Sequence, residues 1–308
     1  MSQVKIPEQM AEAARAVIEG KVPPATPRDA ATVMLLRPVA APARSRGPAG
    51  GGATGGSLSS AGASEGGQSG DGGFEVYMLR RKPSMAFAPG AYVFPGGSVD
   101  QRDADEEVAW AGPDVDHWGQ VFDAPHELAR ALVCAAVRET FEESGVLLAG
   151  PSADSVVADT TGQDWEADRQ ALLDRSLSLA EMLARRSLIL RSDLLRPWSR
   201  WITPAVEPRR FDARFFAAAL PAGQRTRDVG GEAAAVRWIS PARALDAGRA
   251  GEIHLWLPTA MTLAELAEYP DFGAVLAARR NVQPLLPEIV VAEGATWLKV
   301  PGEREYPL

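Results

Sequence analysis

Cysteine and histidine are scarce in this sequence: one cysteine, Cys134, and three histidines occur in 308 residues. A lone cysteine cannot form a disulfide within the chain, which is typical of proteins from a reducing compartment. So few cysteines and histidines also exclude the ligand spacings of a zinc site. No apolar run approaches the roughly 18 residues that cross a bilayer, and the N-terminus predicts an amphipathic helix rather than a secretory signal. These absences favour a cytoplasmic protein that does not enter a membrane.

The charge balance disfavours another class of function. Lysine and arginine number 32 against 40 aspartates and glutamates, which gives a net charge of −8. We therefore expect no extended surface for nucleic acid. Hydrophobic residues make up 46% of the chain, enough for a substantial core. We expect one domain over residues 1–308, and the sequence leaves the oligomeric state open.

A glycine-rich tract interrupts the first part of the chain. Residues 44–73 hold 12 of the 29 glycines, no aromatic residue and one leucine, so nothing there offsets the entropy of ordering and we expect a disordered loop. Strand-like apolar runs flank it at 31–41 and 74–81. Because the entropy of loop closure grows slowly with length, these runs predict a hairpin with an enlarged tip, not a domain boundary.

The rest of the chain mixes strand and helix patterns. An aromatic run over 90–100 is broken by Pro-Gly-Gly, and residues 101–126 are acidic and irregular, with some helical character near 103–112. Apolar residues at every fourth position predict a helix over 127–144, and Gly145 follows as its C-terminal cap. Further patterns predict helices in 163–187, two strands in 200–221, a strand and a helix in 234–245, and short helices in 259–280. Interleaved strands and helices are typical of an α/β or α+β domain.

Three glutamates gather at the end of the predicted helix over 127–144. Glu139, Glu142 and Glu143 fall within an arc of about 100° on the helix surface. Like charges at these spacings destabilise a helix by a few tenths of a kcal/mol per pair, and the helix macrodipole disfavours anions near its C-terminus. A divalent cation reverses both effects, because carboxylate-rich sites suit Mg²⁺ or Mn²⁺. The alternative is an ordinary solvated acidic face.

The residues around this cluster resemble a known family. The sequence RETFEESGV, from Arg138 to Val146, matches the core of the Nudix box, R-E-U-x-E-E-x-G-U, where U is a bulky apolar residue. Thr140 occupies the first apolar position. Upstream, VYMLRRKPSMAFAPGAYVFPGGSVD looks like the motif of one branch, the peroxisomal coenzyme A diphosphatases. The segments RWITP, RRFDARFF and GGEAAAVRW are also similar to that branch, so the resemblance covers roughly residues 30–285.

The box is split in this sequence. Gly97 corresponds to the opening glycine, which 13 residues separate from the arginine in the standard box; here 40 residues separate Gly97 from Arg138. We assign the excess of 27 to an insertion at about 101–126. The box glutamate expected eight residues before Arg138 is replaced by Arg130.

The resemblance implies a Nudix fold, a mixed β-sheet sandwiched between α-helices, and a metal-dependent pyrophosphohydrolase. Its cofactor would be Mg²⁺ or Mn²⁺, held by Glu139, Glu142 and Glu143. Such an ion neutralises phosphate oxygens and activates a water molecule. The substrate would be a nucleoside diphosphate derivative, coenzyme A or acyl-CoA in the branch that the sequence resembles. The chain ends in EYPL, without the peroxisomal address of some relatives, which keeps the expected location cytoplasmic.

Several residues are candidates for supporting roles. Arg138 would orient a ligand carboxylate, and Gly96 and Gly97 would let the backbone approach the metal. The family pattern suggests a general base at Glu232, with Glu207 as second choice. Cationic residues for the phosphates are Arg80, Arg81 and Arg210. Each of these side chains also has an ordinary structural explanation, as a surface ion pair, a turn residue or a solubilising charge.

Two alternatives to this function remain open at the level of sequence. The same chemistry could act on NADH or ADP-ribose. A catalytically silent Nudix module could instead bind a nucleotide and act through a partner, and the substitution at Arg130 and the long insertion favour it.

Overall fold

The fold is described by a computed structural model over residues 3–5, 8–39, 73–85, 88–105, 107–227, 233–292, 295–299 and 307–308. Two expectations lie outside these ranges: the glycine-rich tract, apart from residue 73, and the candidate base Glu232.

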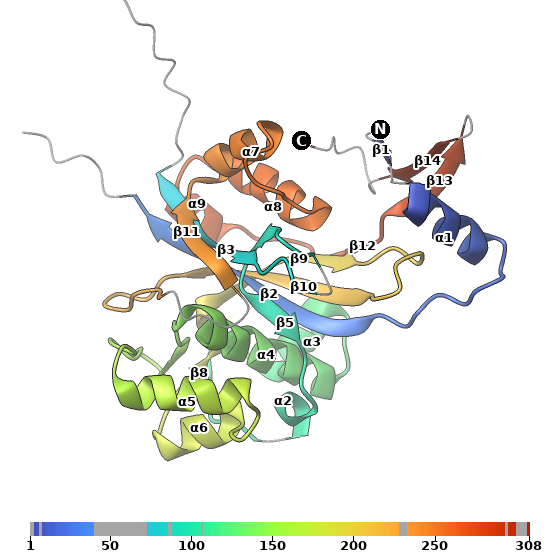
Figure 1. The fold of residues 1–308 in the computed structure, drawn as a ribbon. Coiled ribbons are helices and arrows are strands. Elements are labelled where there is room, and N and C mark those ends of the chain that lie inside the picture. The colour runs from blue at the N-terminus through green and yellow to red at the C-terminus, as the bar shows by residue number, and fades with distance from the viewer. Residues whose placement is uncertain are drawn as a thin grey trace, which may run out of the picture.

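A mixed sheet forms the centre of the molecule (Figure 1). Within the described residues it has eight strands, in the order β11-β3-β2-β10-β9-β12, with β4 paired to β3 and β5 paired to β2. Strands β2 and β10 are parallel, as are β9 and β12, and the other pairs are antiparallel. The strands are β2 (Arg28–Pro38), β3 (Phe74–Arg81), β4 (Tyr92–Val93), β5 (Gly96–Ser98), β9 (Leu195–Ile202), β10 (Phe211–Ala219), β11 (Ala233–Ile239) and β12 (Pro284–Leu285).

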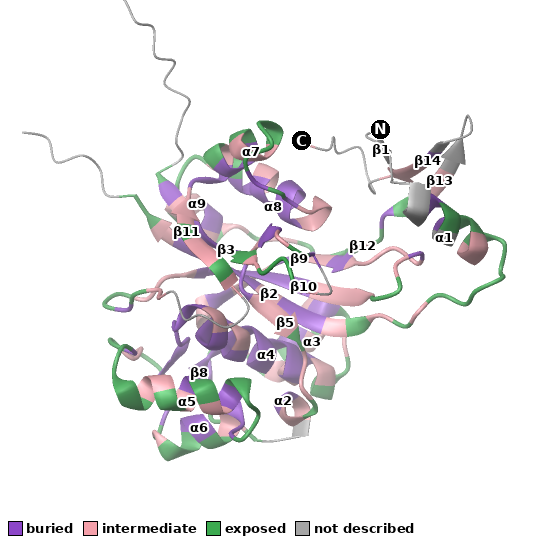
Figure 2. Ribbon diagram, in the orientation of Figure 1, coloured by how far each residue is buried: buried purple, intermediate pink, exposed green. Residues whose placement is uncertain are grey.

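Helices cover both faces of this sheet. One face carries α2 (Gln101–Asp105), α3 (Val115–Phe122), α4 (His126–Ser144), α5 (Gln163–Leu173) and α6 (Leu179–Arg185); the other carries α7 (Pro241–Arg249), α8 (Leu257–Ala267) and α9 (Phe272–Ala277). Alternate residues of β2 enter the two cores: Val33 and Leu35 pack with α4, whereas Met34 and Leu36 pack under α8. A strand buried on both faces is apolar without alternation. The predicted α/β sandwich is confirmed, and buried residues line both interfaces (Figure 2).

Strands β2 and β3 form the predicted hairpin and then diverge. They pair where Leu36 faces Val76 and Pro38 faces Phe74, directly beside the glycine-rich tract. Farther from it, β2 pairs with β5 and β3 pairs with β4. The short β4–β5 segment therefore fills the opening between the two long strands.

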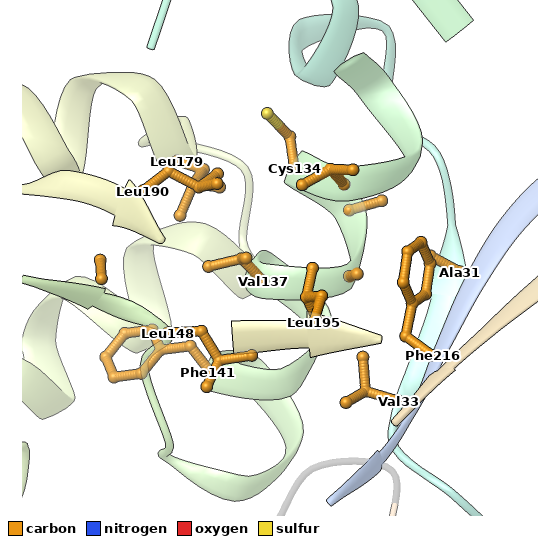
Figure 3. Close-up of a cluster of buried hydrophobic side chains, with 14 of the residues drawn as sticks. Ala31, Val33, Cys134, Val137, Phe141, Leu148, Leu179, Leu190, Leu195 and Phe216 are labelled. Atoms are coloured by element: carbon orange, nitrogen blue, oxygen red, sulfur yellow. The ribbon is translucent and has the colours of Figure 1, made fainter. Parts of the chain in front are cut away.

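Helix α4 begins one residue before the predicted start and has the predicted end and the predicted cap. Its apolar positions Ala129, Val133, Val137 and Phe141 are fully buried in the core cluster that includes Val33 and Phe216 of the sheet. In Figure 3, Val33 lies beside Phe216, and Phe141 lies beside Leu148. Gly145 follows with φ 74°, and its amide donates to the Phe141 carbonyl oxygen. Only glycine adopts this conformation readily.

Cys134 on the same helix is buried, and burial raises the pKa of its thiol to about 12. It therefore packs as a small apolar residue.

Two small sheets complete the described fold. In one of them β14 (Ala295–Lys299) pairs with both β1 (Gln3–Lys5) and β13 (Glu288–Ala292), so a strand near the N-terminus joins two late strands beside α1 (Glu8–Ile18). The other sheet consists of β6 (Trp110–Ala111), β8 (Ile189–Arg191) and β7 (Ala149–Gly150), with a 3₁₀ turn at Ser192–Leu194.

Among the described residues no helix has the length and apolarity to span a bilayer. The cytoplasmic location, the lack of nucleic-acid binding and the single domain stay predictions.

Candidate active site

The last two turns of α4 lie against β5, where β2 and β3 diverge. The Gly96 amide donates to Glu143 Oε2 at 2.7 Å. At Gly97, a Cβ atom would stand 2.5 Å from Glu139 Oε1, and at Gly96 it would stand 2.5 Å from the Ala31 carbonyl oxygen. No larger side chain fits at either position without a shift. The glycine pair thus lets the backbone approach the glutamates closely.

Arg138 lies at the centre of the acidic cluster. Its Nη1 donates to Glu139 Oε1 at 2.7 Å and to Glu142 Oε1 at 3.2 Å. Its Nη2 donates to Asp103 Oδ2 at 2.9 Å and to the Ser98 carbonyl oxygen at 2.9 Å. The side chain is only 9% exposed, so these charge-assisted bonds are screened little by water. One guanidinium faces three carboxylates.

Burial and the neighbouring charges shift the pKa values of the side chains in this cluster. Burial raises the pKa of Glu139 to about 7, although the Arg138 charge opposes the shift. Burial also raises the pKa of Glu142. Burial alone would lower the pKa of Arg138, but Glu139 and Asp103 raise it above its usual value. The cluster therefore carries more negative charge than its burial favours, and an added cation would relieve that excess.

The donor set fits a hard divalent cation. Several carboxylates come together on one helix, and carboxylate oxygens are the ligands that Mg²⁺ and Mn²⁺ prefer. In the described part of the chain, however, no group of three or more Asp, Glu, His or Cys side chains is arranged around a common point. Glu139 and Glu142 bond to Arg138, while Glu143 bonds to Gly96. These bonds explain why the carboxylates do not converge.

The site includes an acid that the sequence reasoning missed. Asp103 is buried and binds Arg138, whereas Arg130, at the expected box position, donates to the Ala104 carbonyl oxygen at 3.5 Å. In the standard spacing the box acid is the sixth residue after the glycine, and Asp103 is the sixth residue after Gly97. Counting forward from the glycine would have found it. The 27 extra residues therefore lie between Asp103 and Arg138.

A cavity of about 840 Å³ opens from this cluster across the sheet. Its polar wall includes Glu139, Glu142 and Glu143, with Arg81 and Arg175 among its cations. Its apolar wall includes Phe94, Trp201, Phe215, Trp256 and Leu257. The cavity is therefore suited to a ligand with one charged and one apolar part.

The predicted substrate residues separate into two groups. Arg81, Gly96 and Gly97 line the cavity. Arg80 is exposed and donates to the Gly90 carbonyl oxygen, and Arg210 donates to the carbonyl oxygens of Thr203 and Ala25. Neither of these two arginines is among the cavity residues, and we leave both out of the proposed site.

Glu207, the second choice for a general base, also lines the cavity. Burial raises the pKa of its carboxyl group. A carboxylate in this state is a stronger base than an exposed one.

A model of the NUDT19 Nudix domain matches residues 113–266, half of the chain. The chain belongs to this Nudix family. Curated relatives include the acyl-coenzyme A diphosphatase NUDT19 of Homo sapiens, 28% identical over 280 residues, and that of Xenopus laevis, 26% identical over 276 residues. Each alignment covers 76% of this chain and 72% of the relative. The protein is thus a Nudix hydrolase of the NUDT19 family.

Solved structures agree on the fold. A Nudix hydrolase from Alicyclobacillus acidocaldarius superposes with a TM-score of 0.60 and 24% identity. The superposition covers 83% of this chain and 98% of that one. The Nudix fold expected from the sequence is confirmed.

Proposed function

We propose that this Nudix hydrolase cleaves the diphosphate of coenzyme A or its acyl thioesters, with Mg²⁺ or Mn²⁺ as cofactor. The observation that carries the proposal is the cavity, which joins the Glu139–Glu143 cluster to an apolar wall. A diphosphate linked to an acyl chain has the same two parts. The curated relatives named acyl-coenzyme A diphosphatase support this choice.

In this proposal Glu139, Glu142 and Glu143 hold the metal. A bound ion of this kind neutralises phosphate oxygens and lowers the pKa of an attacking water. Arg138 keeps Glu139 and Glu142 in place through its hydrogen bonds, and the Gly96 amide does the same for Glu143. The same contacts hold the carboxylates apart in the described structure, so these side chains would turn toward a common point when the ion binds.

The remaining roles concern the substrate and the proton. Arg81 lines the cavity and would contact a phosphate oxygen through its guanidinium. Glu232 stays our first choice for the general base. Glu207 is the described alternative, because it faces the same cavity and burial raises the pKa of its carboxyl group.

The test is a panel of diphosphates incubated with the protein and Mg²⁺ or Mn²⁺. The panel contains coenzyme A, a medium-chain and a long-chain acyl-CoA, NADH and ADP-ribose, and mass spectrometry identifies the products. We expect 3′,5′-ADP and a phosphopantetheine species, with the acyl group retained on the latter. If NADH or ADP-ribose were turned over faster than coenzyme A and the acyl-CoAs, coenzyme A would be rejected as the substrate class, but diphosphate hydrolysis would still stand as the reaction.

One of the two observations that favoured a catalytically silent Nudix module no longer favours it. The substitution at Arg130 favoured it, but Asp103 supplies the acid that pairs with Arg138. Absence of turnover on the whole panel, with metal binding intact, would restore that alternative.

A further inference from the structure

The end of helix α4 is held by a side chain from another helix. The helix ends at Ser144, so the Glu142 carbonyl oxygen lies in the last turn. The Val146 amide would donate to it in a longer helix but donates to Ser144 Oγ instead, at 3.2 Å. Arg169 of α5 takes this place: its Nη1 donates to the Glu142 carbonyl oxygen at 2.9 Å. A carbonyl at a helix end needs such a partner when it is buried.

Arg169 is aimed at this carbonyl by Glu166, one turn earlier on α5. The Arg169 Nε donates to Glu166 Oε2 at 2.9 Å, and Nη2 donates to Oε1 at 2.5 Å. This two-bond contact fixes the plane of the guanidinium and directs Nη1 to Glu142. The Arg169 side chain is 1% exposed, so it has little freedom to move. Its hydrogen bonds also lower the pKa of Glu166 to about 2.

A second arginine joins the same end of the helix. Arg227 Nη1 lies 3.4 Å from Glu166 Oε2, and its backbone amide donates to the Ser144 carbonyl oxygen at 3.0 Å. A Cβ atom on Gly145 would stand 2.8 Å from Arg227 Nε. Two guanidinium groups therefore lie at the negative end of the α4 dipole, close to the glutamates that this dipole disfavours.

We propose that Arg169, aimed by Glu166, is a positioning residue for the metal-binding carboxylates. Glu142 and Glu143 belong to the turn whose backbone Arg169 holds. Misplacement of a reacting or binding group by about 1 Å can cost about 100-fold in rate. The inference rests on the proposed metal-dependent function, because it concerns the carboxylates that would hold the ion.

The test compares Arg169→Gln and Arg169→Lys with a matched control at the C-terminal cap of the neighbouring helix α6. Arg186 stacks on Trp165 and bonds to Asp164 and Asp168 of α5, so Arg186→Gln also removes ion pairs from α5. No hydrogen bond joins Arg186 to Glu142 among the described contacts. A fourth variant, Glu166→Gln, keeps Arg169 but weakens the contact that aims it.

Two readouts separate positioning from general stability. The first is the half-saturating Mn²⁺ concentration, obtained by titration calorimetry without substrate. The second is the separate effect on kcat and KM for coenzyme A. For Arg169→Gln we expect the half-saturating Mn²⁺ concentration to rise, and kcat to fall, each by about 10-fold or more, with a smaller change in KM. Arg169→Lys and Glu166→Gln should shift the same quantities less, and Arg186→Gln should leave the Mn²⁺ value at the wild-type level.

The outcomes distinguish the inference from the function on which it rests. If wild type binds Mn²⁺ and turns over coenzyme A, but the Arg169 variants match Arg186→Gln in both readouts, the positioning role is wrong. If wild type shows neither Mn²⁺ binding nor turnover, the proposed function fails and the inference fails with it. Should Arg169→Gln not fold, Arg169→Lys and Glu166→Gln decide by the same comparison.

Discussion

Arg138 donates to Asp103 across 35 residues of sequence, with Nη2 and Oδ2 2.9 Å apart. The two side chains are 9% and 3% exposed. This pair closes the split Nudix box in space: the acid and the arginine meet as neighbours although an insertion separates them along the chain. The residues between them form β6, α3 and the first part of α4, so the insertion adds its own secondary structure without separating the two halves of the box.

Asp103→Asn should weaken both stability and activity. Breaking a buried ion pair costs about 3–5 kcal/mol, and we expect the lower end of this range because Arg138 keeps Glu139 and Glu142 as partners. Chemical denaturation measures the change in the free energy of unfolding. Arg130→Glu, which restores the acid at the position counted back from Arg138, is the control and should give no gain in activity. If the free energy of unfolding of Asp103→Asn equalled that of wild type, the Asp103–Arg138 pair would not stabilise the fold.

Much of the fold was predictable because its signals are local. The apolar period of α4 and the glycine that caps it lie within one short stretch, and both predictions are confirmed. Strand β3 also has the expected limits, Phe74–Arg81. The short strands β6, β7 and β8 gave no such signal, because two or three residues are too few to show a period. The described part of residues 101–126, predicted as irregular with some helical character near 103–112, contains α2, β6, α3 and the first residue of α4.

The site was predictable only where its residues are close in sequence. Glu139, Glu142 and Glu143 share one helix and one motif. Asp103 and Arg169 act through tertiary contacts. The spacing from Gly97 is the one sequence signal for Asp103, and nothing near Arg169 in the sequence distinguishes it from other charged residues. Arg210 was a candidate for phosphate binding, but two backbone carbonyls bind its guanidinium. Which partner an arginine finds depends on the folded structure.

Glu143→Gln should abolish most of the turnover and leave the fold intact. Glutamine is nearly isosteric and can still accept the hydrogen bond from the Gly96 amide, but it is a poor ligand for Mg²⁺. We expect kcat to fall by about 100-fold or more, since changes outside the ligand set already cost 10–100-fold. Glu127→Gln, on an exposed residue in the first turn of the same helix, is the control. A rate near that of wild type would remove Glu143 from the mechanism.

Glu139→Gln should stabilise the metal-free protein at neutral and higher pH. Burial raises the pKa of Glu139 to about 7 from its usual 4.5, so the folded state binds this proton more tightly than the unfolded state. The free energy of unfolding therefore falls as pH rises from about 4.5 to about 7. Glutamine mimics the protonated form and avoids this loss. With EDTA present, the melting temperature of the variant should exceed that of wild type at pH 8 and match it near pH 4.5.

Added Mn²⁺ should reverse this order at pH 8. The ion stabilises wild type by an amount that grows with the ratio of its concentration to its Kd, and the variant lacks one of the proposed ligands. If wild type remained the less stable protein at saturating Mn²⁺, Glu139 would not be a metal ligand.

Deletion of residues 47–70 should leave activity unchanged and raise stability slightly. It shortens the connection between β2 and β3 from 35 residues to 11, which reduces the entropy of loop closure by about 1 kcal/mol. The hairpin pairs at Leu36–Val76 and Pro38–Phe74 lie outside the deletion. Denaturation and the coenzyme A assay measure both effects. A large loss of activity would assign the tract a role in catalysis.

Leu257→Trp should reduce turnover of acyl-CoA more than turnover of coenzyme A. Leu257 is half-buried in the apolar wall of the cavity, so a larger side chain there takes space that an acyl chain would occupy. Misfit of this size in an apolar pocket changes kcat/KM by about 10-fold or more. Leu286→Trp is the control, because Leu286 is 42% exposed and lies outside the cavity. If the ratio of the two kcat/KM values stayed at the wild-type level, the acyl chain would lie elsewhere and the apolar wall would serve another part of the substrate.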